Sequence, residues 1–146
     1  MNLRWRSAGE HDLEAVISLI RQDSRTPERA GIERLRAAFH AMDARADSDL
    51  IVGELDGRVV ATYQIFLIEA VSLSAPLRAQ LEDIRVDANL RGQGIGAALM
   101  ADAEARAKAA GASLVQLLSN RSRVETHRFY EAQGYTASHF GFKKRV

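Results

Sequence analysis

The segment Arg91-Gly92-Gln93-Gly94-Ile95-Gly96 has residue types suited to binding an anion. It follows a strand-like run and opens a long alanine-rich run with helical spacing. Glycines let the backbone approach a ligand closely, and the free N–H groups at a helix N-terminus favour negative charge. Arg91 adds a full positive charge. The segment therefore predicts a cradle for a pyrophosphate or, as the alternative, a glycine-rich turn that only joins a strand to a helix.

Two common phosphate motifs do not account for this segment. The P-loop pattern ends in Gly-Lys-Ser/Thr, whereas Gly96 is followed by Ala97-Ala98. The dinucleotide fingerprint is Gly-x-Gly-x-x-Gly, whereas the glycines here stand at 92, 94 and 96. Neither pattern explains the loop.

The elements that must position this loop are those of a mixed α/β domain. Apolar patterning predicts strands over residues 3–6, 50–55, 59–68, 81–86 and 114–118, and a terminal hairpin over 135–144. Helical spacing predicts helices over 10–22, from Thr26-Pro27-Glu28 onward, over 95–110 and over 122–133. The order β-α-α-β-β-β-α-β-α-β-β predicts one α/β domain over residues 1–146, with a mixed sheet.

Composition and charge narrow the class of protein. Of the 146 residues, 47% are hydrophobic and 27% charged, as in globular proteins, and the net charge is +1. That balance predicts no nucleic-acid partner and no membrane partner. The absence of cysteine excludes disulfides and thiolate nucleophiles. Residues 1–6 lack the apolar core of a signal peptide, and no apolar run approaches about 18 residues, so we expect a cytoplasmic protein.

Three separate motifs resemble the GCN5-related N-acetyltransferase (GNAT) superfamily. Its acetyl-CoA loop reads Gln/Arg-x-x-Gly-x-Gly/Ala, which Arg91, Gly94 and Gly96 match. The likeness includes Glu82-Asp83-Ile84-Arg85-Val86-Asp87 before the loop and the block from Phe129-Tyr130 to Gly134-Tyr135 after it. The resemblance implies the GNAT acyl-CoA N-acyltransferase fold. It also implies an enzyme that transfers an acetyl group directly from acetyl-CoA to a primary amine.

The resemblance implies which residues bind acetyl-CoA. Backbone groups near Val86 are expected along the pantetheine, and those of the glycine loop at the pyrophosphate. Many family members carry asparagine seven residues before the tyrosine, where this chain has Arg123. Arg123 is expected at a phosphate of CoA or at an anionic substrate. The expected set is Ile84, Arg85, Val86, Arg91, Gly92, Gln93, Gly94, Ile95, Gly96, Asn120, Arg123 and Phe129.

Two carboxylates are candidates for the base that the implied reaction needs. An alkylamine has a pKa of about 10.4, so it is mostly protonated at neutral pH and cannot attack. Glu82 and Asp83 precede the loop, and a carboxylate there can accept the proton directly or through water. Adjacent strand residues point to opposite faces, so one of the two is expected to face the amine. We prefer Glu82, with Asp83 or water alone as the alternatives.

Tyr130 matches the family tyrosine that protonates the departing CoA thiolate. A thiol has a pKa of about 8.5, so protonating it as it leaves is useful but not essential. Tyr130 is therefore expected to be catalytic, and the alternative is core packing beside Phe129.

The last third of the chain is similar to the aminoalkylphosphonate acetyltransferase branch, through His127-Arg128-Phe129-Tyr130, Gly134-Tyr135 and Ser138-His139-Phe140. That similarity implies a small amine with an anionic phosphonate as the acceptor, and a divalent metal ion used in activity. The candidate substrate contacts border the expected pocket and are Tyr63, Gln64, Arg78 and Gln80. His127 and His139 are a weak metal pattern, so no structural metal is expected.

Other acceptors and another class of protein stay open at this point. The acceptor is alternatively an amino sugar, a polyamine, an antibiotic or a protein N-terminus. A non-catalytic acetyl-CoA sensor is the rival class, although a binder needs neither Glu82 nor Tyr130. Family analogy implies a homodimer that acts on a small-molecule amine.

Overall fold

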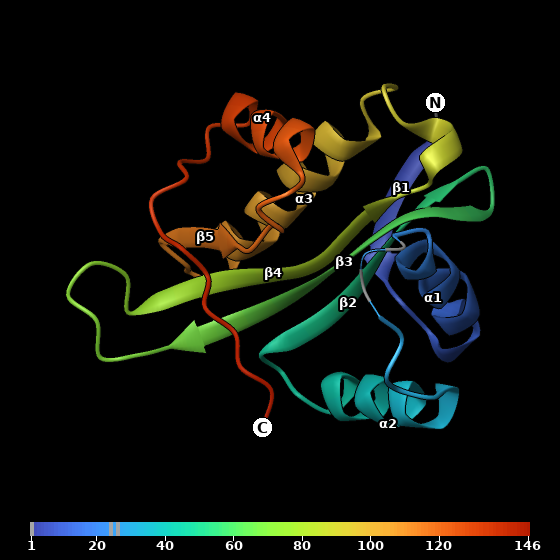
Figure 1. Cartoon of the computed structure of the whole chain (residues 1–146). Helices are drawn as coiled ribbons and strands as arrows, with labels where there is room; N and C mark the ends of the chain where they lie inside the picture. Colours follow the sequence, from blue (N-terminus) through green and yellow to red (C-terminus); the bar gives the residue numbers. More distant parts are fainter. Residues whose placement is uncertain (1, 24, 26) are drawn as a thin grey trace. The chain divides into compact units, whose positions relative to one another are not determined.

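The computed structural model describes residues 2–23, 25 and 27–146. Within these ranges the chain forms a mixed five-stranded sheet and four α-helices (Figure 1). Its contacts divide it into two compact units, Met1–Gln116 and Leu117–Val146. The expected α/β class is confirmed, and the elements follow the expected order as far as the last helix.

The strands lie in the sheet in their order along the chain. They are β1 (Leu3–Ser7), β2 (Ser48–Leu55), β3 (Arg58–Glu69), β4 (Leu77–Val86) and β5 (Leu114–Leu117). The first four pair with their neighbours in antiparallel fashion. The N–H of Ser113 donates to the carbonyl of Leu77 at 3.1 Å, and the Gln116 side chain donates to that of Gln80. Going from the first pair to the second, the residue number rises by three in β4 and by three in β5. The two strands therefore run in the same direction, so β5 is parallel to β4.

The helices are α1 (Leu13–Arg21), α2 (Ile32–Asp43), α3 (Ile95–Ala109) and α4 (Val124–Ala132). Short 3₁₀ turns precede α1 and α3, at Glu10–Asp12 and Ala88–Leu90. In the first unit α1 packs on β3 and β4, α2 packs on β2, and α3 packs on β3 and β4.

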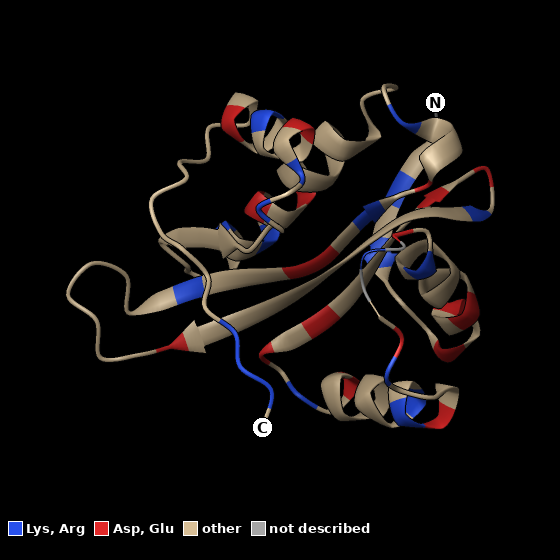
Figure 2. Ribbon diagram, viewed as in Figure 1, with Lys and Arg blue, Asp and Glu red and all other residues tan. Residues whose placement is uncertain are grey.

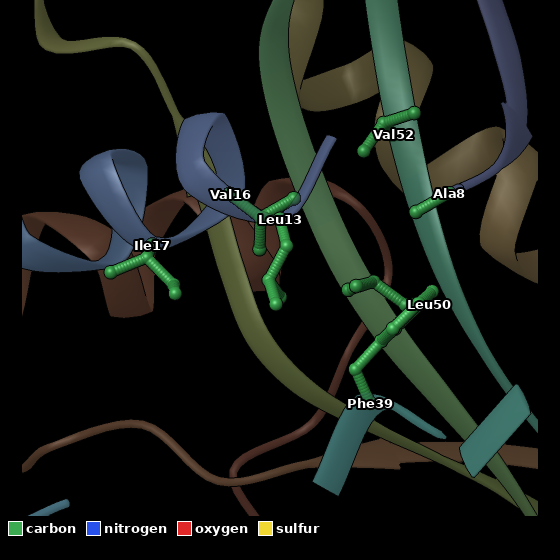
Figure 3. Close-up of a cluster of buried hydrophobic side chains, with 7 residues drawn as sticks. All are labelled: Ala8, Leu13, Val16, Ile17, Phe39, Leu50 and Val52. Carbon is green, nitrogen blue, oxygen red and sulfur yellow. The ribbon is translucent and has the colours of Figure 1, made fainter. Parts of the chain in front are cut away.

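Different helices cover the two faces of the sheet. A hydrophobic cluster joins α1 and α2 to β2 (Figure 3); its members are Ala8, Leu13, Val16, Ile17, Phe39, Leu50 and Val52. Tyr63 of β3 bonds instead to Asp102 of α3. Tyr63 pairs with Ile51, the residue between Leu50 and Val52, and neighbouring strand residues point to opposite faces. One side of the sheet is therefore the α1/α2 face, and the other is the α3 face.

α3 is anchored by a buried stripe and begins and ends as its sequence predicts. The buried residues are Ile95, Leu99, Met100, Ala103 and Ala107; Leu99 and Met100 are adjacent, and the other steps are three or four residues. Gly111 follows the helix with a φ of +88°, the left-handed conformation common after a helix C-terminus. The stripe holds the helix on the sheet, so the position of its N-terminus is defined.

The second helix begins later than expected. Thr26 lies outside the described residues, and residues 27–30 are not helical. Gly31 is the N-cap, and α2 begins at Ile32. The apolar stripe that packs on the core includes Leu35, Phe39 and Met42, so burial supports a helix only from about Ile32 onward.

The expected hairpin at the C-terminus is wrong. Residues 135–146 form neither a strand nor a helix. Phe140 and Phe142, which lie in the segment predicted as a hairpin, have 89% and 92% of their surface exposed. Alternation predicts extended backbone, but a strand also needs a partner to accept its hydrogen bonds, and an isolated two-stranded hairpin is only marginally stable.

Basic and acidic side chains are interspersed along the strands and helices (Figure 2), in keeping with the net charge of +1. In the part of the chain that the structure describes, no helix is long and apolar enough to cross a bilayer.

Candidate active site

A β-bulge interrupts β4 where the two candidate carboxylates lie. Gln64 of β3 pairs with Glu82, and Thr62 pairs with Arg85. One residue of β3 therefore lies opposite two residues of β4, Asp83 and Ile84. Asp83 has a φ of +46°, which is strained for a residue other than glycine. The bulge resets the alternation of side chains along β4.

The bulge places both carboxylates at Gln64. Glu82 lies opposite Gln64 on the α1/α2 face. The Gln64 side-chain nitrogen Nε2 lies 3.5 Å from Asp83 Oδ2. The expectation that the two carboxylates point to opposite faces is therefore wrong, because it assumed a regular strand. The Asp83 side chain is 42% exposed, and its other oxygen lies 3.4 Å from Nη2 of Arg85.

Arg85 connects this strand to the end of α1. Its side chain is 12% exposed, and Nη1 donates to the carbonyl of Ile84 at 2.9 Å. Nη2 lies 3.9 Å from Asp23, two residues after α1. The guanidinium is thus held beside the bulge, while the backbone of residues 84–86 forms the last part of β4.

A second hydrogen-bond chain reaches Glu82 from β5. Nε2 of Gln116 donates to Oε1 of Gln80 at 2.7 Å. Nε2 of Gln80 lies 3.4 Å from Oε1 of Glu82. Sequence reasoning missed Gln116; its signal is a lone polar residue within the apolar run Leu114-Val115-Gln116-Leu117.

The glycine loop leads into the open N-terminus of α3. Gly92 and Gly94 have φ values of +76° and +83°, and Gly94 is the N-cap. A Cβ at either position would meet no atom within 4 Å, so backbone conformation rather than space requires glycine there. Gly94 has no side chain to accept the N–H groups of the first turn. The loop can therefore present those groups to an anion.

The loop residues differ in which part faces outward. Arg91, Gly92, Gln93 and Gly94 are exposed, whereas the Ile95 side chain is buried and Gly96 is half-buried. Ile95 anchors the helix with its side chain and offers only its backbone to a ligand.

The predicted substrate contacts divide between the two faces. By register Gln80 pairs with Phe66 and Arg78 with Ile68, so both share the α1/α2 face with Glu82 and Gln64. Arg78 Nη2 donates to Ser72 Oγ at 2.9 Å and to the carbonyl of Ala75 at 3.0 Å. Arg78 thereby fastens the loop between β3 and β4.

Tyr63 lies on the α3 face and is fully buried. Its hydroxyl donates to Asp102 Oδ2 at 2.6 Å, and Nε of Arg106 donates to the same oxygen at 2.8 Å. Burial, followed by the hydrogen bond to Asp102, raises the pKa of Tyr63 above its usual range. These contacts give Tyr63 a structural role, so it is left out of the substrate site proposed below.

The C-terminal unit contains α4 and its aromatic cluster. The ring centroid of Tyr130 lies 5.3 Å from that of Phe129 and 6.2 Å from that of Tyr135. Arg123 is the N-cap residue of α4. Asn120 Oδ1 accepts hydrogen bonds from the backbone N–H of Ser122 at 3.0 Å and its hydroxyl at 2.8 Å. Asn120 thus shapes the turn before α4.

Within the described ranges, no three His, Asp or Glu side chains group as metal ligands. The residues do not fit a resident divalent ion, and no step below involves one.

Known proteins similar to this chain include acetyltransferases of defined acceptors. A segment of 94 residues is 45% identical to an aminoalkylphosphonate N-acetyltransferase of Salmonella typhimurium, covering 64% of this chain and 58% of that protein. The match therefore spans less than two thirds of that relative's length. A glucosamine 6-phosphate N-acetyltransferase of Trypanosoma brucei brucei is 25% identical over 137 residues, 94% of this chain and 91% of that protein.

A solved structure and a family model extend the comparison to almost the whole chain. The crystal structure of a transcriptional regulator from Bacillus halodurans superposes with a TM-score of 0.93 and 31% identity, over 99% of this chain and 100% of that chain. The model of the GNAT acetyltransferase family matches residues 13–135. The chain therefore belongs to the GNAT family of N-acetyltransferases.

Proposed function

We propose that this enzyme transfers the acetyl group of acetyl-CoA, by direct attack, to the primary amine of a small anionic acceptor. The observation that carries the proposal is the bulge in β4, the strand that leads to the loop before α3. At this bulge Glu82 and Asp83 both lie close to Gln64 of the neighbouring strand β3. Residues 1–146 act in this proposal as one N-acetyltransferase domain.

Acetyl-CoA is the proposed acetyl donor. The N–H groups of residues 92–96 bind its pyrophosphate, with Arg91 adding positive charge, and backbone groups of residues 84–86 bind its pantetheine. Support comes from the family match and from the exposed loop at the open N-terminus of α3. Arg123 and Phe129 are further proposed CoA contacts, and Asn120 shapes the turn that presents Arg123.

Glu82 is the proposed general base. It accepts a proton from the ammonium group, directly or through water, because only the neutral amine can attack the thioester carbonyl carbon. The C–N bond forms, the C–S bond breaks, and Tyr130 protonates the departing thiolate. The nitrogen loses a further proton as it becomes an amide, and that proton, passed through water, restores the Tyr130 hydroxyl. Asp83 is the alternative base, since Gln64 reaches it as well.

The proposed acceptor carries an amine and an oxyanion on phosphorus. Both curated relatives are named for such acceptors, an aminoalkylphosphonate and a glucosamine 6-phosphate. Gln64, Gln80 and Arg78 share the α1/α2 face with Glu82 and are the proposed contacts. Among the three, only Arg78 carries a charge that can pair with the oxyanion.

A second candidate function is an acetyl-CoA-binding sensor. The solved structure that is 31% identical to this chain is that of a protein described as a transcriptional regulator, which favours this second function. A sensor needs the loop of residues 91–96 but no base, so turnover separates the two functions.

We further propose a homodimer in the cytoplasm that acts on small molecules rather than on nucleic acid. The almost fully exposed apolar side chains include Val71 and Leu73 in the loop after β3, and Phe140 and Phe142 near the C-terminus. Exposed apolar patches of this kind favour association with another protein surface.

Thiol release from acetyl-CoA tests the proposed function. The amine panel contains aminoalkylphosphonates, amino-sugar phosphates, aminoglycosides and polyamines, each with and without magnesium. The chain has no cysteine, so its own thiol background is nil. Release with an amine that carries a phosphonate or phosphate, and little with its uncharged analogue, supports the proposal.

Two outcomes would contradict it. Thiol release only with amines that carry no phosphonate or phosphate would rule out an anionic acceptor. Saturable acetyl-CoA binding with no release on any amine would replace the transferase by the sensor.

A further inference from the structure

Two glutamines form a bridge between β5 and β4 beside Glu82. Gln116 Nε2 donates to Gln80 Oε1 at 2.7 Å, and Gln80 Nε2 lies 3.4 Å from Glu82 Oε1. All three residues are half-buried. The contact with Glu82 is long, as catalytic hydrogen bonds often are before a substrate arrives.

The bridge has a direction. A glutamine amide has one accepting end and one donating end. The Gln116 N–H occupies the accepting end of Gln80, so the donating end of Gln80 is turned toward Glu82 Oε1, at 3.4 Å, and toward the carbonyl of Leu81, at 3.5 Å. An ionised carboxylate only accepts hydrogen bonds. The polarity of the Gln116 contact therefore selects the orientation of Gln80 that suits an ionised Glu82.

The bridge lies where the two parallel strands stop running together. β5 ends at Leu117, one residue after Gln116, whereas β4 continues past Gln80 to Val86. The bulge at Asp83 follows within that continuation. Glu82 thus lies just past the end of β5, where its backbone still pairs with β3, and the side-chain bridge connects it to β5 as well.

Asp83 is held differently. The Asp83 carboxylate accepts long hydrogen bonds from Nε2 of Gln64 in β3, at 3.5 Å, and from Nη2 of Arg85 in its own strand, at 3.4 Å. Neither partner is oriented by a further side chain from β5. The glutamine bridge therefore contacts Glu82 and not Asp83, so a substitution at Gln116 is expected to act on Glu82 first.

We propose that Gln116, acting through Gln80, is a positioning residue that keeps the Glu82 carboxylate ionised and aimed at the acceptor amine. This role rests on Glu82 being the base of the proposed reaction. Gln116 itself touches no reacting atom.

Gln116→Glu is the test, because it nearly preserves shape and reverses polarity. An ionised Glu at 116 accepts from Gln80, so the Gln80 amide turns and presents its carbonyl oxygen to Glu82. We expect kcat to fall about tenfold or more, since a hydrogen bond to a charged group is lost, with KM for acetyl-CoA within about twofold. The separate variant Gln116→Lys keeps a hydrogen-bond donor at this position, so its kcat should stay within about threefold of the wild-type value.

A control variant adds the same charge in the C-terminal unit. Gln133→Glu makes the same chemical change after α4 and should leave kcat within about twofold of the wild type. An equal loss of kcat in the two Glu variants would overturn the positioning role, as would wild-type kcat in Gln116→Glu.

A double-mutant cycle tells positioning from a structural role. In a Glu82→Gln background, Gln116→Glu should lower the residual kcat by less than about twofold, because its target is gone. The same tenfold loss in both backgrounds would make Gln116 structural. Glu82→Gln with wild-type kcat would refute the base and the positioning role together. Loss of kcat in Glu82→Gln but not in Gln116→Glu would refute the positioning role alone.

A measurement without turnover completes the test. The side-chain amide resonances of Gln80 should shift as Glu82 titrates, because the two groups are in contact. That step should disappear in Glu82→Gln. A new step should appear in the double variant Glu82→Gln, Gln116→Glu, because the Gln80 amide then donates to the carboxylate at position 116. No new step in the double variant would show that residue 116 does not orient Gln80.

Discussion

The two faces of the β3–β4 pair carry side chains of different kinds. On the α3 face, Tyr63, Ile65, Ala79 and Leu81 are buried, and the Tyr63 hydroxyl is bonded to Asp102. On the α1/α2 face, Gln64, Arg78, Gln80 and Glu82 are half-buried and bond to one another or to neighbouring loops. The same two strands therefore hold a helix with one face and offer polar groups with the other.

This difference suits the proposed function, which needs a firmly held cofactor site and an accessible base. The buried stripe of α3 fixes the helix whose N-terminus is the proposed pyrophosphate site. The bulge at Asp83 breaks the regular strand on the side where chemistry is proposed. We therefore expect substitutions on the α1/α2 face to lower activity, and substitutions on the α3 face to lower stability.

The largest effect is expected for Glu82→Gln. Removing the base should lower kcat/KM at neutral pH about 10²- to 10⁴-fold, because the amine then keeps its proton. The free energy of unfolding should change by less than about 0.5 kcal/mol, since the residue is half-buried and keeps its shape. Steady-state kinetics and urea denaturation check the two values. Asp83→Asn is the matched variant, and a larger loss there would make Asp83 the base.

Gly94→Val should weaken acetyl-CoA binding. Gly94 has a φ of +83°, which costs a β-branched residue about 1–3 kcal/mol and reshapes the loop. KM for acetyl-CoA should rise about tenfold or more, with a smaller change in kcat. Gly57→Val is the control, because Gly57 has a φ of +82° in the β2–β3 turn and is equally open. A similar rise in KM for both variants would mean that strain alone is responsible.

Tyr130→Phe should lower kcat about tenfold and leave KM for acetyl-CoA within about twofold. The effect is moderate because a thiolate with a pKa of about 8.5 can leave without help. Tyr135→Phe removes a hydroxyl from the same aromatic cluster and should keep wild-type kcat. Parallel loss of kcat and acetyl-CoA affinity in Tyr130→Phe would instead make the tyrosine structural.

The smallest effect is expected for Tyr63→Phe on the α3 face. The variant loses the hydrogen bond to Asp102, while Arg106 still pairs with that carboxylate, so unfolding should become about 1 kcal/mol easier. The ring contact with Trp5 is kept. Kinetic constants should match the wild type within about twofold. A tenfold loss of kcat at unchanged stability would place Tyr63 in the active site after all.

Most of the fold could be predicted because its signals are local. The periodic stripe from Ile95 to Ala107 identified α3, and the glycines at 92 and 94 marked its open start. The Asp56-Gly57 dipeptide between β2 and β3 is also a local signal, typical of a hairpin turn, and both residues have positive φ. Each of these features depends only on residues next to it in sequence.

The parts that could not be predicted depend on pairing between distant strands. The bulge at Asp83 exists only in the register of β4 against β3, so the two carboxylates were wrongly expected on opposite faces. Gln116 meets Gln80 only because β5 lies parallel to β4. At the C-terminus the sequence pattern predicted strands that the structure does not contain. Residues 135–146 find no strand to pair with, and a local pattern cannot reveal this.

The dependence of kcat/KM on pH, compared between the wild type and Glu82→Gln, tests the central claim most directly. With an acceptor found in the amine panel, the wild type should exceed the variant at least about 100-fold at pH 7. The gap should close as the pH approaches about 10.4, where the amine loses its proton without a base. A gap that stays constant with pH, or no gap at pH 7, would contradict the assignment of Glu82 as the base.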